Sequence, residues 1–511
     1  MTLKICIIGA GFSGIAAGIQ LKKQLNIEDY VIFDENEDVG GTWLVNKYPG
    51  CACDVGSHLY SYSFEPNPDW SWAYSPQAEI WRYIQSVAKK HDLYKNIKFG
   101  HKVNKASWDE TINKWRVVVT NSATNDEAEL IFDVVITGIG GFRVPHTPEE
   151  FKAFTGPRIH SARWDTSVKL EDKTVAVIGS GASAVQIIPN IVKKVKKLIV
   201  YQRHPAWVLP RMQFQMPDWL KWAFASVPGL REMYRSFIFW SNELIHPTFI
   251  QGSLMQKLGV GQKKKPLCLN LLRPYYSFVK FGAKLGDHYL NRKFADNPAL
   301  LEKVRPNYEL GCKRITPSNE YYPALAHPNV EVVRDKITKV GTNSITTENG
   351  DEKKIDVLIL ATGFKVQEFF SPLEIRVKGG MDLMELWREK GPTAYMGICT
   401  SVAPNWFMLL GPNTGIDHSS GIFTIECQLN YILQVIREMI ERDSKVVCVK
   451  EFIEQGYMAD MMADMKPMVW GTGCASYYVN YRGVVTALSP YSLISCWRHT
   501  RTLNENDFNF N

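Results

Sequence analysis

The sequence predicts an α/β protein with two Rossmann-like dinucleotide-binding domains and a helical insertion. A strand-like run at residues 4–8, a glycine-rich turn and a helix-like stretch at 13–25 open the chain, and the same order returns at 174–192. Such alternation is typical of a parallel sheet covered by helices. The third observation is an aromatic-rich, helix-like stretch at about 212–305, which interrupts the strands.

Length and composition are those of a folded protein with several domains. The 511 residues favour two to four domains. Hydrophobic residues make up 45% and charged residues 22%, which excludes a disordered or fibrous chain. The net charge of +7 is small for this length, so it weakly favours anionic ligands and does not indicate nucleic-acid binding.

Cysteine usage and the N-terminus indicate a cytoplasmic protein. Only Cys51 and Cys53 are near neighbours among ten cysteines, so neither a metal site nor a redox CxxC pair is predicted. The chain enters a strand at once, without the basic and apolar segments of a secretory signal. No apolar run is long enough for a transmembrane helix.

The first glycine-rich turn predicts a flavin site. Gly9, Gly11 and Gly14 form a GxGxxG pattern between strand and helix, and Asp34 ends the next strand. Glycines let the backbone approach a pyrophosphate, the helix N-terminus stabilises its charge, and the carboxylate accepts from a ribose hydroxyl. Because a carboxylate repels a 2′-phosphate, this site favours FAD or NAD.

The second glycine-rich turn predicts an NADP(H) site. Gly179, Gly181 and Ala184 again follow a strand, but Arg203 and His204 stand where the first motif has a carboxylate. A guanidinium can pair bidentately with a 2′-phosphate. The alternative is that Arg203 merely faces solvent.

Two dinucleotide sites in one chain indicate electron transfer from a nicotinamide to a flavin. A disulfide reductase would need a cysteine pair at the flavin, and the spacing of Cys51 and Cys53 does not match the usual one. Dioxygen is therefore the favoured electron acceptor.

The order of elements predicts three segments. Residues 1–145 form the first part of the FAD-binding domain, 146–340 the NADP-binding domain with its insertion, and 341–511 the second part of the FAD-binding domain with a C-terminal substrate-pocket segment. The runs KWRVVVT and ELIFDVVIT predict a β-meander packed on the first sheet.

The stretch FTGPRIHSARWD carries a family resemblance. Phe154, Gly156, His160, Trp164 and Asp165 fill the pattern FxGxxxHxxxW(P/D) between the two nucleotide motifs. Further matches are GGTWLVNKYPGCACD, YQRHPAW, GCKRI and LGPNTGIDHSS, which together span almost the whole chain. On these residues the chain resembles the class B flavoprotein monooxygenases, and among them the type I Baeyer–Villiger monooxygenases.

The resemblance implies oxidation of an apolar ketone to an ester or lactone by NADPH and O2, through a peroxide at flavin C4a. It implies a catalytic role for Arg314, which Asp54 would hold, and places Lys313 beside NADP. His160 would control domain movement from the linker, or else be a structural hydrogen-bonding residue. Oxidation of sulfur or nitrogen and simple NADPH oxidation remain alternatives.

The motifs and the resemblance together give two sets of candidate cofactor-binding residues. Those for FAD are Gly9, Gly11, Ser13, Gly14, Asp34, Gly41, Thr42, Trp43, Asp54, Tyr60, Val103 and Asn413. Those for NADP are Gly179, Ser180, Gly181, Ser183, Ala184, Arg203, His204 and Lys313. The chain departs from the family at Tyr477, where a Trp is common, and this aromatic residue is predicted to line the pocket.

Overall fold

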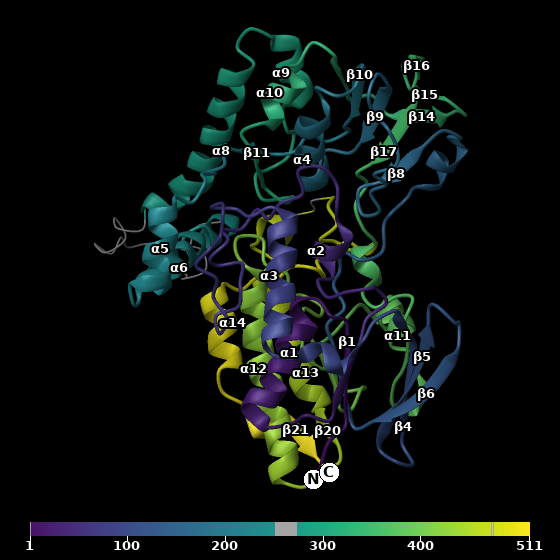
Figure 1. Cartoon of the computed structure of the whole chain (residues 1–511), viewed down its shortest axis with the longest axis vertical. Coiled ribbons are helices and arrows are strands. Elements are labelled where there is room, and N and C mark those ends of the chain that lie inside the picture. Colours follow the sequence, from purple (N-terminus) through teal and green to yellow (C-terminus); the bar gives the residue numbers. More distant parts are fainter. Residues whose placement is uncertain (1, 251–272, 472, 474) are drawn as a thin grey trace, which may run out of the picture.

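Figure 1 shows the computed structural model of the chain, which describes residues 2–250, 273–471, 473 and 475–511. Two units follow one another along the longest axis, and both chain termini lie at the far end of the first unit (Figure 1). Each unit is built on a five-stranded parallel sheet, as the sequence predicts.

The first unit has the strand order β19-β7-β1-β2-β3. These strands are β1 (Ile5–Ile8), β2 (Tyr30–Phe33), β3 (Ile97–Lys98), β7 (Val134–Thr137) and β19 (Trp406–Met408). All are nearly or fully buried except for the end of β3, because helices cover the sheet and both faces of each strand must be apolar. The helices α1 (Phe12–Leu25) and α12 (Gly421–Glu441) pack against each other in this unit.

A smaller sheet flanks the first one and has the order β18-β4-β5-β6. It comprises β4 (His101–Asp109), β5 (Lys114–Asn121), β6 (Glu127–Phe132) and β18 (Glu374–Arg376). The predicted meander is present, since β5 pairs with β6 and the chain then enters β7. Trp115 of β5 packs on Trp406 of β19 with ring centroids 4.8 Å apart, which joins the two sheets.

The second unit has the strand order β13-β10-β9-β17-β8. Its strands are β8 (Arg158–His160), β9 (Thr174–Ile178), β10 (Lys197–Tyr201), β13 (Val330–Val333) and β17 (Val357–Leu360). Because β17 pairs with both β8 and β9, the second unit continues beyond residue 340, and the sequence-based boundary there falls too early. The intervening hairpin strands β14 (Ile337–Val340), β15 (Ser344–Thr347) and β16 (Glu352–Lys354) form a separate antiparallel sheet.

The remaining elements cover the sheets or join the units. In the first unit they are α2 (Thr42–Val45), α3 (Gln77–Lys90), α11 (Leu383–Lys390), α13 (Glu451–Met465), α14 (Leu493–Thr500), β20 (Val447–Val449) and β21 (Phe508–Phe510). In the second unit they are α4 (Ala182–Ile191), α10 (Tyr321–Leu325), β11 (Val208–Leu209) and β12 (Thr316–Pro317). No helix in the described ranges is both long and apolar enough to cross a membrane.

The insertion predicted at about 212–305 is helical where the structure describes it, and residues 251–272 lie outside the described ranges. Its described α-helices are α5 (Asp218–Ser226), α6 (Leu230–Glu243), α8 (Arg273–Lys293) and α9 (Pro298–Val304). One face of α6 packs on the first unit. Arg235 of α6 donates to the carbonyl oxygens of His58 (2.6 Å) and Ser61 (3.0 Å). Phe239 packs on Phe423 of α12, with ring centroids 5.1 Å apart.

His58 is buried where the insertion meets the first unit. Its ring centroid lies 4.7 Å from that of Phe224 and 5.1 Å from that of Tyr234, and neither ring nitrogen has a partner in the described chain. Burial, assisted by Arg231 and Arg235, lowers the pKa of His58 to about 4. The folded protein therefore keeps this imidazole neutral.

We expect the free energy of unfolding to fall between about pH 7 and about pH 5, because only unfolded His58 takes up a proton there. This group alone contributes about 1–2 kcal/mol of the fall. Denaturant titrations at both pH values should show a weaker pH dependence for His58→Asn. The control, His288→Asn on the exposed surface of α8, should keep the wild-type pH dependence. Equal pH dependence in both variants would contradict the assignment.

Candidate functional site

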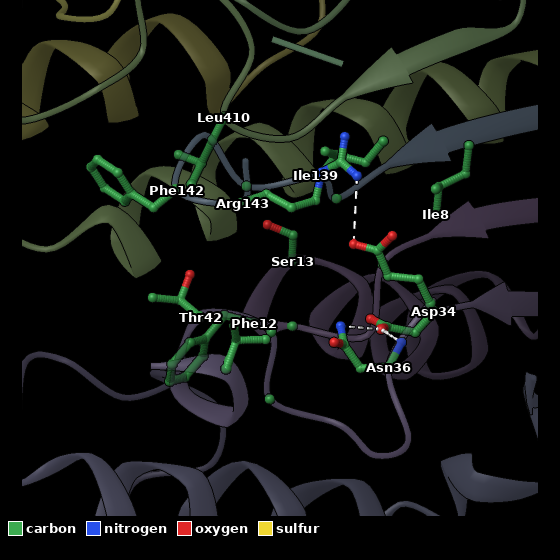
Figure 2. A pocket seen from close by; sticks show the side chains of 18 of the residues that line it. Ile8, Phe12, Ser13, Asp34, Asn36, Thr42, Ile139, Phe142, Arg143 and Leu410 are labelled. Atoms are coloured by element: carbon green, nitrogen blue, oxygen red, sulfur yellow. Dashed lines mark hydrogen bonds and ion pairs between the residues drawn. The ribbon is translucent and has the colours of Figure 1, made fainter. Parts of the chain in front are cut away.

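A cavity lies over the turn between β1 and α1, at the carboxyl edge of the first sheet (Figure 2). It is lined by nine candidate FAD-binding residues: Gly9, Gly11, Ser13, Asp34, Gly41, Thr42, Trp43, Tyr60 and Val103. Figure 2 shows Ser13, Asp34 and Thr42 around one space. The other three candidates, Gly14, Asp54 and Asn413, are not among the lining residues.

The tight turn under the cavity requires glycine. A Cβ added at Gly14 would lie 1.8 Å from the carbonyl oxygen of Gly9. Gly9 itself has a φ of +101°, and its Cβ would lie 2.9 Å from the carbonyl oxygen of Gly138, just after β7. Gly14 therefore acts beneath the cavity, by letting α1 start directly against the β1 turn.

Asp34 is fixed at the rim of this cavity. Its Oδ2 accepts from the Ala10 amide at 2.6 Å, and its Oδ1 accepts from the backbone and side-chain nitrogens of Asn36, both at 2.8 Å. Burial raises the pKa of Asp34, although these hydrogen bonds oppose the shift. A tight glycine turn at a helix N-terminus with a carboxylate after the next strand fits the pyrophosphate and ribose of a dinucleotide.

The second glycine turn is built in the same way. Gly179, after β9, has a φ of +121°, and a Cβ there would lie 2.4 Å from the carbonyl oxygen of Ala361, just after β17. Ser180 Oγ donates to the carbonyl oxygen of His204 at 2.6 Å, which ties this turn to the end of β10. The candidates Ser183 and Ala184 lie in the first turn of α4, whereas Gly181 has open space around its Cβ position.

Basic side chains gather at this second turn. Burial lowers the pKa of Lys313, and the charge of Arg203 lowers it further. Partial desolvation and the charge of Lys313 likewise lower the pKa of His204. Arg203 and His204 are exposed. Because the charges of Arg203 and Lys313 repel one another, this site suits an anion such as a phosphate.

Arg314 lies beside Lys313 and reaches into the first unit. Its Nε and Nη2 both donate to Asp54 Oδ2, at 2.9 and 2.8 Å. Its Nη1 donates to the carbonyl oxygen of Asp417 at 2.5 Å and to Asp417 Oδ1 at 3.2 Å. The structure thus brings together the predicted pair Arg314 and Asp54, and adds Asp417.

The two carboxylates keep the guanidinium charged. Burial lowers the pKa of Arg314, but Asp54 and Asp417 outweigh it and raise this pKa well above its ordinary value. Tyr478 donates to Asp417 Oδ1 at 2.7 Å. Tyr477 packs edge-on against Tyr478 and against Phe142, which lines the cavity of the first unit.

His160 ends β8, near the two segments that link the units. Its Nδ1 accepts from the Ala162 amide at 3.0 Å, and its Nε2 lies 3.4 Å from Thr362 Oγ1. Thr362 Oγ1 also donates to the carbonyl oxygen of His146. Burial lowers the pKa of His160. Thr362 thus joins the linker segment at 146 to the one at 362, and the imidazole of His160 contacts this junction.

Comparison with known proteins identifies the family. The flavin-binding monooxygenase-like family matches residues 2–220. A Baeyer–Villiger monooxygenase of Pseudomonas aeruginosa is 34% identical over 480 residues, 93% of this chain and 85% of that protein. Another from Streptomyces coelicolor is 34% identical over 513 residues, 98% of this chain and 91% of that protein. The chain belongs to the Baeyer–Villiger monooxygenase family.

Solved structures of other proteins share the fold of this chain over its whole length. A crystal structure of OTEMO in complex with FAD and NADP is 25% identical with a TM-score of 0.82, covering 100% of this chain and 99% of that one. A closed structure of cyclohexanone monooxygenase is 23% identical with a TM-score of 0.81, at the same coverage. These structures support the arrangement of two parallel sheets and a helical insertion.

Sequence reasoning about this family member missed three contributors. Asp417 lies within the matched stretch LGPNTGIDHSS but has no fixed place in a pattern, and Tyr478 is 61 residues away. Arg143 lines the cavity of the first unit, with its Nη1 3.5 Å from Glu35 Oε1 (Figure 2). The position of Arg143 shortly after β7, at the same edge of the sheet as Asp34, could have indicated it.

We expect Gly14→Ala to lower the free energy of unfolding by about 2–4 kcal/mol, because the new Cβ forces the β1 turn away from α1. Gly456→Ala is the control, since Gly456 lies inside α13 with open space around its Cβ position. That exchange should stabilise the protein by about 0.5–1 kcal/mol. Denaturant unfolding measures both changes, and equal stability of the two variants would contradict the steric argument.

Proposed function

We propose that this protein uses FAD, NADPH and O2 to convert apolar ketones to esters or lactones. The observation that carries the proposal is Arg314, a permanent cation from the second unit that Asp54 of the first unit holds. Its neighbour Lys313 belongs to the basic cluster of the second unit, since burial and the charge of Arg203 lower its pKa. One short segment therefore connects Asp54 of the first unit with the basic side chains of the second unit.

The residues of the two turns fit the proposed cofactors. Asp34 would accept from the adenosine ribose of FAD, and the α1 N-terminus would face its pyrophosphate. Arg203 and Lys313 would bind the 2′-phosphate of NADPH. When bound, the two cofactors supply hydride transfer and activation of O2. The complexes of OTEMO with FAD and NADP support this assignment.

Arg314 stabilises negative charge that develops on oxygen during attack on a ketone carbonyl. A fixed guanidinium suits this role because it needs no reorganisation and stays protonated at any working pH. Asp54 orients Arg314 by accepting from two of its nitrogens. His160 contacts Thr362, which binds the other linker segment at His146, and we propose that His160 governs the relative position of the units during turnover.

The test incubates purified flavoprotein with NADPH and a panel of linear, cyclic, aryl and steroidal ketones. Mass spectrometry should detect products heavier by one oxygen atom. Arg314→Ala should keep its flavin but form product on the order of 100-fold more slowly, because one preorganised charge is lost. The control is Arg116→Ala. Arg116 lies in β5 and pairs with Asp109 and Glu129, so this variant should retain activity.

Two results would overturn this proposal. Oxygenation of sulfides or amines with no ketone converted would assign the protein to heteroatom oxidation. Peroxide release that accounts for all NADPH consumed would make it an NADPH oxidase.

We expect Arg203→Ala to raise the KM for NADPH about 10–100-fold while the KM for NADH stays the same, because one charge-assisted pairing with the 2′-phosphate is lost. Steady-state kinetics with both cofactors measures this. The control Lys196→Ala removes an exposed charge just before β10, at the opposite edge of the sheet. An equal loss for NADPH and NADH in Arg203→Ala would contradict the phosphate contact.

A further inference from the structure

We propose that Asp417 is a positioning residue, which fixes the plane of the Arg314 guanidinium and thereby couples NADPH consumption to oxygenation. This inference rests on the proposed function. It concerns direction as well as charge, since Asp54 alone already supplies a counter-ion for Arg314.

The contact with Asp54 leaves Arg314 free to pivot. Both Nε and Nη2 donate to a single carboxylate oxygen, Asp54 Oδ2. A fork that uses both carboxylate oxygens would fix the guanidinium plane, whereas a single acceptor allows rotation about that oxygen. Asp417 supplies the second anchor, because Nη1 donates to its carbonyl oxygen and its Oδ1. The second N–H of Nη2 has no partner in the described chain and is available to a reacting oxygen.

The burial of the Asp417 carboxylate costs free energy that packing does not require. The side chain is only 2% exposed, and its Oδ2 has no hydrogen-bond partner within the described residues. Removing a carboxylate from water is unfavourable unless its oxygens are paired. A neutral side chain would fill the same space without this cost, so packing alone does not account for the carboxylate.

Neighbouring side chains hold Asp417 in place. Tyr478, which is completely buried, donates to Asp417 Oδ1. The next residue, His418, lies 2.9 Å through its Nε2 from Glu243 Oε1, and both side chains are almost fully buried. Glu243 also accepts from the Leu493 amide at the start of α14. Burial raises the pKa of Glu243, but His418 and the amides of Leu493 and Ile494 outweigh this effect and lower the pKa.

The insertion helix α6 contacts both loops that carry the carboxylates. Arg235 binds the loop after Asp54 through the His58 and Ser61 carbonyl oxygens. Two turns further along α6, Glu243 binds His418 beside Asp417. These positions are eight residues apart, so they lie on one face of the helix. The insertion therefore sets the spacing of the two anchors of Arg314.

The experiment compares Asp417→Ala, Asp417→Asn and Tyr478→Phe as purified flavoproteins. We expect Asp417→Ala to form about tenfold less oxygenated product per NADPH consumed. Arg314 keeps its charge and the carbonyl oxygen of residue 417, but it loses the side-chain acceptor Oδ1, which also binds Tyr478 and holds this loop against the guanidinium. Asp417→Asn keeps an acceptor oxygen for Arg314 and Tyr478 and should restore part of the coupling. Tyr478→Phe keeps both carboxylates and should give an intermediate loss.

The control is Glu454→Gln, at another buried carboxylate. Glu454 lies in α13 and accepts from Thr400 Oγ1 and the Ser401 amide. This exchange should lower the free energy of unfolding and leave the coupling ratio at the wild-type value. A loss of coupling equal to that of Asp417→Ala would mean that instability alone is responsible.

A crystal structure of Asp417→Ala separates this inference from the proposed function. We expect the Arg314 guanidinium to be rotated about its contact with Asp54. An unmoved guanidinium together with wild-type coupling would overturn the inference. If Asp417→Ala fails to fold, the ratio of product formed to NADPH consumed in Tyr478→Phe tests the inference instead. A wild-type ratio in that variant would likewise overturn the inference. If the wild type oxygenates no ketone, the proposed function fails, while the direction of Arg314 in the variant still tests the inference.

Discussion

The ion pair between Arg314 and Asp54 is the constraint on which the site depends, because it joins a residue of the second unit to a residue of the first. The residues are 260 positions apart in sequence and come from different units. Surface ion pairs contribute little to stability, but this pair is about three-quarters buried and cannot exchange its partners freely with water. A shift of one unit against the other would therefore displace the guanidinium of Arg314.

The linkers add a second constraint, and it has the same form in both units. Gly9 packs against the carbonyl oxygen of Gly138, the first residue after β7, and Gly179 packs against that of Ala361, the first residue after β17. The chain thus leaves each sheet in contact with that unit's glycine turn. Pro145 and Phe364 then pair across the two linkers. A movement of the linkers would consequently displace the backbone that packs against the glycine turns of the two candidate nucleotide sites.

The parts of the structure that sequence predicted are those determined within short stretches. The turn from Gly9 to Gly14 follows from local sterics, and the position of Asp34 follows from one βαβ unit. The carboxylate of Asp417, in contrast, is part of the site only because it contacts Arg314, 103 residues earlier. No spacing rule in the sequence links these two residues. The boundary at 340 was placed too early for a similar reason, because β17 inserts between β9 and β8 after an intervening hairpin.

The choice of arginine at 314 follows from the arrangement of its acceptors. Asp54 lies on the Nε and Nη2 side of the guanidinium, and Asp417 on the Nη1 side. A lysine ammonium could neutralise either carboxylate, but as a point charge on a flexible stem it has no plane for two acceptors to fix. When two carboxylates fix the plane of the guanidinium, they also fix the direction of the N–H of Nη2 that binds neither of them. The direction of the Arg314 guanidinium is thus set by its acceptors Asp54 and Asp417. The insertion helix α6 helps to hold these acceptors in place, because it contacts the loops that carry both of them.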